Sequence, residues 1–170
     1  MDRAALRSVQ EPLKGRYRDD PAAALVTLTA TGTLGEGITC SVRTGQALAA
    51  AGLHPASGGD GSTLCSGDLL LEALAACAGV TLRAVATSLE IKVAQGQVYA
   101  EGDLDFRGTL GVDRDVPVGF GAVRLRFELE TEATDDQLDT LLRLTERYCV
   151  VFQSLASPPM LSSSWARAED

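Results

Sequence analysis

The sequence has few positive charges for its size. Lysine and arginine together number 15 against 23 aspartates and glutamates, which gives a formal net charge of −8 at pH 7. Phosphate backbones repel a chain this acidic, so the composition argues against nucleic acid as a partner.

The sequence also lacks a long uninterrupted apolar run and an apolar leader. Its longest apolar stretch, Leu69–Val80, contains Glu72 and is shorter than the roughly 20 residues that span a bilayer. The first ten residues, MDRAALRSVQ, lack the apolar core of a signal peptide. We therefore expect a cytoplasmic protein with no membrane partner.

Cysteine is scarce, and the cysteines are far apart. There are 4 in the chain, and no two of them form a CxxC pair. Without a secretory context they do not indicate a disulfide framework. Each is a free thiol, a metal ligand, a redox catalyst or simply a small buried side chain. The four are Cys40, Cys65, Cys77 and Cys149.

What remains is the composition of a folded protein. Hydrophobic residues make up 45% and charged residues 22%, which excludes wholesale disorder. A chain of 170 residues fits one domain with a core that needs no staples. The segment Arg7–Pro21 is polar and of mixed charge. We therefore predict a single domain over residues 1–170 whose first 22 residues form an N-terminal arm.

The first half of the chain predicts a hairpin and a long loop. Apolar residues alternate with polar ones in Ala24–Thr31 and again in Gly37–Arg43, on either side of the turn sequence GTLGEG. Cys40 lies in the second strand, where we expect it to face the core. The segment Thr44–Gly67 is rich in glycine, serine and proline and is predicted to be a mobile or functional loop.

A central helix is predicted next, over Asp68–Leu89. Ser66 can cap it, and Asp68 lies in the first turn, where the helix dipole favours an acid. The first half, LLLEALAACAGV, is apolar on every side, which is typical of a helix buried all round. Cys77 lies in this stretch. Its thiol is expected to be inert unless a cation or a hydrogen-bond donor reaches it.

The second half predicts two antiparallel strands and further helices. The strands are Gln97–Thr109 and Val123–Glu130, each with alternate residues turned to solvent. A capping box at Thr134–Gln137 begins a helix that is followed by one more helical turn, and Met160–Ala168 is a candidate last strand. The fold class is therefore α+β, with antiparallel sheets around the central helix.

Cys77 and Cys149 fall on two different predicted helices. They are either unrelated core residues or one facing pair. The stretch Ser66–Thr81, SGDLLLEALAACAGVT, and the sequence RYCVVFQSL at 147–155 together resemble the paired cysteine motifs of the OsmC/Ohr family of thiol-dependent peroxidases.

This resemblance implies a fold, an assembly and a reaction. The OsmC-like fold is an intertwined homodimer with central helices packed across the dimer and active sites at the interface. Cys77 would be the peroxidatic cysteine, which attacks an organic hydroperoxide and becomes a sulfenic acid. Cys149 would be the resolving cysteine, which forms a disulfide that a dithiol reductant opens. No cofactor and no metal are expected.

The family also pairs a glutamate with an arginine that stabilises the thiolate. The glutamate commonly lies ten residues before the first cysteine, where this chain has Gly67, and the turn GTLGEG contains no arginine. We therefore expect other acids and bases to take these places. The candidate acids are Asp68 and Glu72, and the candidate bases are Arg16, Arg18 and Arg43.

Two further residues have several interpretations. His54, the only histidine, is an exposed loop residue, a contact of the active site or a metal ligand. Cys65, just before the central helix, is an incidental thiol or a site of regulatory oxidation. A zinc site built from His54 and the cysteines matches no standard ligand spacing.

Two other functions compete with the peroxidase. In the first, an OsmC-like protein without enzymatic activity binds an apolar ligand in the dimer groove. In the second, the fold is a scaffold and its cysteines are inert. Retention of both motif cysteines favours the enzyme.

Overall fold

The computed structural model describes residues 2–8, 10–11, 31–34, 39–44, 47–111 and 113–167. The first sheet has the order β1-β2-β3-β4, and the second consists of β5 and β6. The strands are β1 (Thr31–Leu34), β2 (Thr39–Thr44), β3 (Ala47–Gly52), β4 (Leu64–Cys65), β5 (Val93–Leu104) and β6 (Phe120–Thr131). The helices are the 3-10 helix η2 (Pro55–Ser57) and the α-helices α2 (Ser66–Leu89), α3 (Phe106–Thr109), α4 (Asp135–Tyr148) and α5 (Val150–Ala156).

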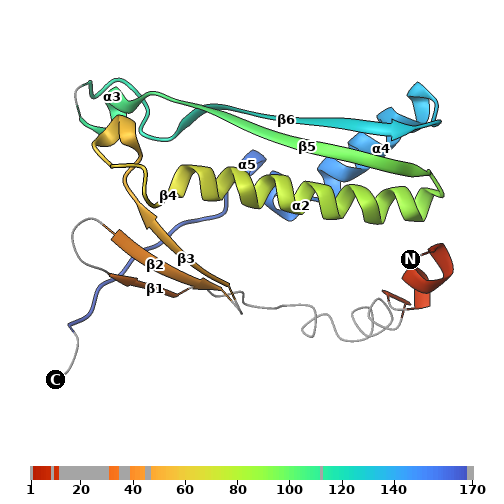
Figure 1. Ribbon diagram of the computed structural model, residues 1–170, viewed down its shortest axis with the longest axis horizontal. Helices are drawn as coiled ribbons and strands as arrows, with labels where there is room; N and C mark the ends of the chain where they lie inside the picture. Colours follow the sequence, from red (N-terminus) through yellow and green to blue (C-terminus); the bar gives the residue numbers. More distant parts are fainter. Residues whose placement is uncertain are drawn as a thin grey trace.

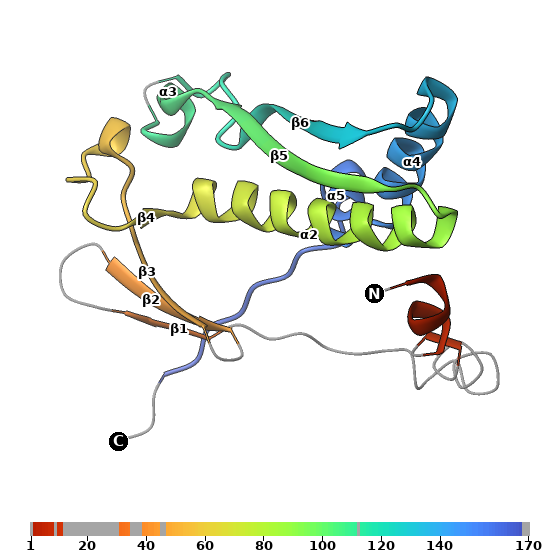
Figure 2. The same ribbon diagram turned by 45° about the vertical axis from the view of Figure 1, so that its right-hand side comes forward.

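The long helix α2 is the axis of the molecule. It runs alongside the two long strands β5 and β6 and contacts α4 and α5 (Figure 1). The first sheet extends away from this body beyond β4, as both views show (Figure 2). The mixture of antiparallel strands and helices confirms the predicted α+β class.

The predicted hairpin is only partly described. β2 agrees with the expected second strand, but β1 includes the first three residues of the predicted turn, Gly32–Leu34. Leu34 pairs with Cys40, so the first strand of the hairpin continues to Leu34, past its predicted end at Thr31. Most of the expected strand Ala24–Thr31 lies outside the described residues, as does the side chain of Cys40.

The predicted loop Thr44–Gly67 is wrong in part, because it contains two strands and a helix. β3 pairs antiparallel with β2, with Val42 opposite Ala49, and β4 pairs parallel with β3. The alanine-rich sequence of β3 has low strand propensity and no alternation, so only its pairing with β2 defines it. The chain therefore reaches α2 from a sheet edge.

α2 differs from its prediction at its start and in its burial. It begins at Ser66, so Cys65 and not Ser66 is the N-cap, and no side chain caps the helix there. One face is buried, whereas Val80 on another face is 73% exposed. The single chain covers only that one face, because β5, β6, α4 and α5 all pack against it. The buried residues are Leu74, Ala78, Leu82, Val85 and Ala86.

The helix α2 is longer than the apolar stretch Leu69–Val80 that it contains. At 24 residues, α2 is long and apolar enough to cross a bilayer, the one such helix among the described residues. The core helix of a water-soluble fold meets the same criterion, so length and composition do not distinguish a membrane span from a core helix.

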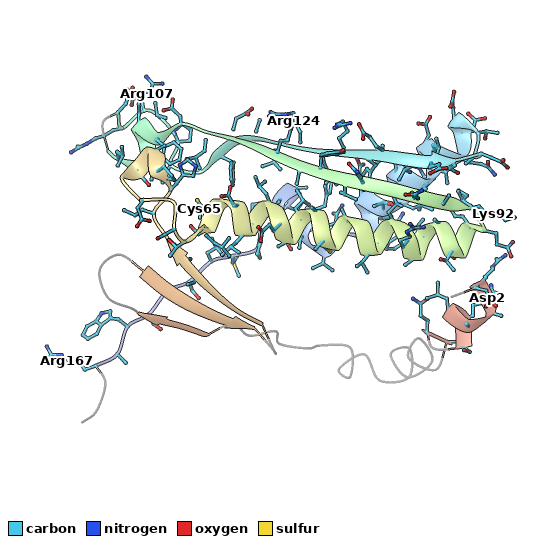
Figure 3. The ribbon with its side chains drawn as sticks, in the orientation of Figure 1. Asp2, Cys65, Lys92, Arg107, Arg124 and Arg167 are labelled. Carbon is cyan, nitrogen blue, oxygen red and sulfur yellow. The ribbon has the colours of Figure 1, made fainter. Side chains whose placement is uncertain are left out.

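The two long strands form as their alternation predicts. Val98 in β5 and Phe127 in β6 turn toward α2, and Arg124 points away from it on the outer face (Figure 3). The first of the two strands ends earlier than predicted, at Leu104. Asp105 then accepts a hydrogen bond from the backbone N–H of Arg107 and caps the short helix α3.

The C-terminal helices confirm one prediction and correct another. The capping box of α4 is present, with Thr134 and Gln137 bonding each other's backbone N–H groups. The further turn is α5. The predicted last strand is absent from 160–167, the described part of Met160–Ala168. Trp165 is 83% exposed there, and none of the described strands pairs with the segment.

A core substitution tests the packing of α4 on α2. Leu141 is 1% exposed and packs against Leu82, whereas its neighbour Leu142 is 40% exposed. Leu141→Ala should lower the free energy of unfolding by about 2–5 kcal/mol, because it removes buried methyl groups and leaves a cavity. Leu142→Ala is the matched control and should cost less than about 1 kcal/mol. Denaturant titration at one protein concentration measures both, and equal losses would contradict this packing.

Candidate active site around Cys77 and Cys149

Cys77 and Cys149 are brought together by two separate parts of the chain. Cys77 is half-buried in the middle of α2. Cys149 is 0% exposed and belongs to two helices at once, as the C-cap of α4 and the N-cap of α5. The two side chains meet in one apolar cluster with Leu74 and Ala78.

The two thiols contact each other directly. Both are free, and the Cys149 thiol donates a hydrogen bond to the sulfur of Cys77. The structure therefore arranges them as a facing pair. A disulfide between two cysteines requires such proximity.

Uncharged donors surround the Cys77 sulfur. Burial raises the pKa of this thiol, but hydrogen bonds from the backbone N–H groups of Val151 and Val150, from the Cys149 thiol and from the Thr81 hydroxyl outweigh it. The pKa of Cys77 is therefore lowered from its ordinary value. Thr81 lies one helical turn after Cys77, and the two valines form the first turn of α5. These groups therefore stabilise the thiolate form of Cys77.

Cys149 is shifted in the opposite direction. Burial raises the pKa of its thiol, and the hydrogen bond and charge of Cys77 raise it further, against the backbone N–H groups of Phe152 and Val151. The pKa values of the two thiols are therefore shifted in opposite directions, that of Cys77 downward and that of Cys149 upward.

An apolar cavity of about 530 Å³ lies beside the cysteine cluster. It is bounded by the first half of α2, the start of β6 and helix α5. Three of its lining residues, Leu74, Leu125 and Phe152, also pack in the cluster that holds Cys149. A mainly hydrocarbon molecule fits the chemistry of these walls.

Comparison with known families decides the relationship. The family model described as OsmC-like protein matches residues 59–164, which include both cysteines. The chain belongs to the OsmC-like protein family. The comparison with curated proteins finds no match.

Solved structures share the fold of this OsmC-like protein at low sequence identity. An OsmC-like protein from Mycoplasma pneumoniae has a TM-score of 0.67 at 16% identity, covering 78% of this chain and 89% of its own. An organic hydroperoxide resistance protein from Elizabethkingia anophelis, with thiocyanate bound, has a TM-score of 0.63 at 20% identity and coverages of 79% and 91%. An OsmC-like protein of unknown function from Vibrio cholerae has a TM-score of 0.63 at 15% identity and coverages of 76% and 94%. These likenesses establish the fold.

The acids and bases expected around Cys77 are not at its side among the described residues of the OsmC-like protein. Asp68 and Glu72 are exposed on α2, and the helical rise places Asp68 roughly 13 Å from Cys77 along the axis. The largest influences on the pKa of the Cys77 thiol come from burial, backbone N–H groups, the Cys149 thiol and the Thr81 hydroxyl, and none of these is a carboxylate or a cation. Arg16 and Arg18 lie outside the described residues, and Arg43 is described only as backbone in β2.

The donors that reach Cys77 were not anticipated from the sequence. Backbone N–H groups leave no residue-type signal, so Val150 and Val151 could be found only through the helix break at Cys149. Thr81 had a detectable signal, because a threonine four residues after a helical cysteine lies on the same face. The sequence indicates only that a cation or a hydrogen-bond donor must reach Cys77, and it does not show that Thr81 is that donor.

His54 and Cys65 lie elsewhere in the OsmC-like protein. His54 caps η2, with its Nδ1 accepting a hydrogen bond from the N–H of Ala56 at 3.0 Å, and its ring stacks on Phe106. Cys65 stands at the start of α2 (Figure 3), roughly 18 Å along the helix from Cys77. The described ranges contain no cluster of three or more metal-ligating side chains.

Proposed function

We propose that this OsmC-like protein is a thiol-dependent peroxidase that reduces organic hydroperoxides, with Cys77 as the peroxidatic and Cys149 as the resolving cysteine. The observation that carries the proposal is the contact between a thiol whose pKa is lowered and a buried thiol whose pKa is raised. The thiolate and not the thiol is the form of cysteine that attacks a peroxide, and a neighbouring thiol traps the sulfenic acid before further oxidation.

The reaction follows from this division of roles. The Cys77 thiolate attacks the terminal peroxide oxygen, the O–O bond breaks, and Cys77 becomes a sulfenic acid. The alkoxide that leaves gains a proton and becomes the alcohol. Cys149 then attacks the Cys77 sulfur, a disulfide forms, and water is released. A dithiol reductant restores both thiols by exchange.

The apolar surroundings favour an organic substrate over hydrogen peroxide. The cavity beside the cysteines is lined mainly by aliphatic and aromatic side chains. An alkyl or aryl group gains free energy by leaving water for such a site, and hydrogen peroxide has no such group. The structural neighbour named as an organic hydroperoxide resistance protein supports this substrate class.

We infer that the working form is an intertwined homodimer in a reducing cytoplasm. Val80 and Leu70 are exposed on α2, which leaves apolar helix surface without cover in one chain. The first sheet extends away from the body of its own chain (Figure 1). A second copy supplies cover of the right shape for both, and free thiols persist in a reducing compartment.

The decisive experiment combines peroxide consumption with the titration of Cys77. With a dithiol as reductant, the protein should consume cumene hydroperoxide, and alkylation of Cys77 should titrate below the roughly 8.5 of a free cysteine. The reactive form is the thiolate, so both rates should fall as the pH drops through the pKa of Cys77 and level off above it. Stopped-flow assays and mass spectrometry across a pH series measure the two.

The same titration tests the proposed charged partners. Arg43 and Arg18 remain the proposed sources of a guanidinium, with Asp68 or Glu72 orienting it. If one of these arginines stabilises the thiolate, its replacement in Arg43→Ala or Arg18→Ala should raise the alkylation pKa above that of wild type. Unchanged pKa values in both variants would exclude Arg43 and Arg18 as the source of the guanidinium.

The second candidate function is binding of an apolar ligand without catalysis. The apolar cavity favours it, since such a site needs no reactive thiol. An alkylation pKa at or above that of free cysteine, together with no consumption of hydroperoxide, would replace the peroxidase with this function.

A further inference from the structure

We propose that Cys149 also acts in the first step, as the proton donor to the alcohol that leaves when Cys77 attacks the hydroperoxide. This inference rests on the proposed function and assigns Cys149 a catalytic role before it resolves the sulfenic acid.

The position of Cys149 is fixed by the two helices that meet at it. Its backbone N–H donates to the carbonyl of Thr145 at 2.9 Å, and its own carbonyl accepts from the N–H of Gln153 at 2.9 Å. The side chain is 0% exposed and packs in the cluster beside Cys77. Its thiol is near enough to the Cys77 sulfur to help lower the pKa of Cys77.

The chemistry of the first step requires a proton at this place. Attack by the Cys77 thiolate on the terminal oxygen leaves the O–H on sulfur and expels an alkoxide, which is a strong base and a poor leaving group. The proton of Cys149 passes to that alkoxide, so the products are a sulfenic acid, a neutral alcohol and a Cys149 thiolate.

The same transfer prepares the second step. The Cys149 thiolate is the form that attacks the sulfenic sulfur, the S–O bond breaks, and hydroxide is released. Overall, one thiolate, one thiol and one hydroperoxide give a disulfide, an alcohol and hydroxide, so atoms and charge balance.

The other donors around Cys77 are poorly suited to this task. In the described part of the chain they are two backbone amides and the Thr81 hydroxyl, all much weaker acids than a thiol. Burial and the negative charge of Cys77 raise the pKa of Cys149, which keeps its proton in place until the alkoxide forms. The thiol is therefore both close enough and acidic enough.

The test compares two oxidants that differ in the base they release. tert-Butyl hydroperoxide expels an alkoxide, whereas peracetic acid expels acetate, which needs no proton. The rate of sulfenic acid formation at Cys77 is measured in a single turnover, on the plateau above the pKa of Cys77. Cys149→Ala should slow the alkyl hydroperoxide by about 100-fold, within the range of general acid catalysis, and peracetic acid by much less.

Two variants separate this effect from misfolding and from loss of a thiol in general. Cys149→Ser keeps the size of the side chain and an O–H donor, and should fall between wild type and Cys149→Ala. Cys65→Ser removes a thiol far from the site and should match wild type with both oxidants.

Each remaining outcome decides the question. If Cys149→Ala forms the sulfenic acid at the wild-type rate, or slows both oxidants equally, Cys149 is not the proton donor, while the proposed function stands as long as wild type reduces the alkyl hydroperoxide. A wild type that does not react with alkyl hydroperoxide overturns the proposed function and this inference with it.

Discussion

Replacing Cys77 with serine should lower the rate of hydroperoxide reduction by about three orders of magnitude or more. A serine hydroxyl stays protonated near neutral pH, and the donors that lower the pKa of Cys77 do not make it a comparable nucleophile. Serine nearly preserves the volume at this half-buried position, so the fold should be retained. Peroxide consumption and single-turnover oxidation with cumene hydroperoxide measure the loss.

Cys65→Ser is the matched control for that loss, because it also exchanges a half-buried thiol on or beside α2. Its turnover should stay within about twofold of wild type, as for a substitution away from the reacting atoms. Loss of activity in Cys65→Ser with activity retained in Cys77→Ser would place the nucleophile at the start of α2 and defeat the proposed mechanism.

The second large effect is expected on assembly. Val80 is 73% exposed on α2 in the single chain and is expected to be covered by a second copy in the proposed homodimer. Val80→Asp would bury an unpaired carboxylate there at a cost of about 3–5 kcal/mol, which weakens dimerisation by roughly 100-fold to several thousandfold. Light scattering and sedimentation at micromolar concentration should show wild-type dimers and largely monomeric Val80→Asp.

Val118→Asp provides the comparison, because Val118 is 63% exposed in the segment before β6 and does not belong to α2. This variant should remain dimeric. A monomeric wild type, or equal dissociation of the two variants, would remove α2 from the interface.

Patterns with strong local signals were predicted well from the sequence. The alternation of β5 and β6 and the capping box at Thr134 each specify a local conformation that packing then stabilises. The facing of Cys77 and Cys149 depended on the family resemblance, since nothing in the spacing of two distant cysteines shows that they meet.

Features defined by pairing with distant residues were predicted poorly. β3 is a strand because β2 lies beside it, and the segment Met160–Ala168 lacks a partner strand within the described chain. The burial of α2 was overestimated because an apolar sequence shows that a helix needs cover and not which chain supplies it. The activation of Cys77 depends on backbone groups of α5, which carry no sequence signature.

Cys149 lies where α4 meets α5, so a disulfide from it to Cys77 would cross-link two separate parts of the fold. In the proposed reaction, each oxidation ties the middle of α2 to the α4–α5 boundary and closes a loop of about 70 residues, and each reduction opens it again. A covalent loop of this size lowers the conformational entropy of the unfolded chain. In the chain-entropy description this raises the free energy of unfolding by about 4 kcal/mol. The enzyme would therefore be most resistant to unfolding just after it meets a peroxide, and the dithiol that restores its activity would also return it to its less stable form.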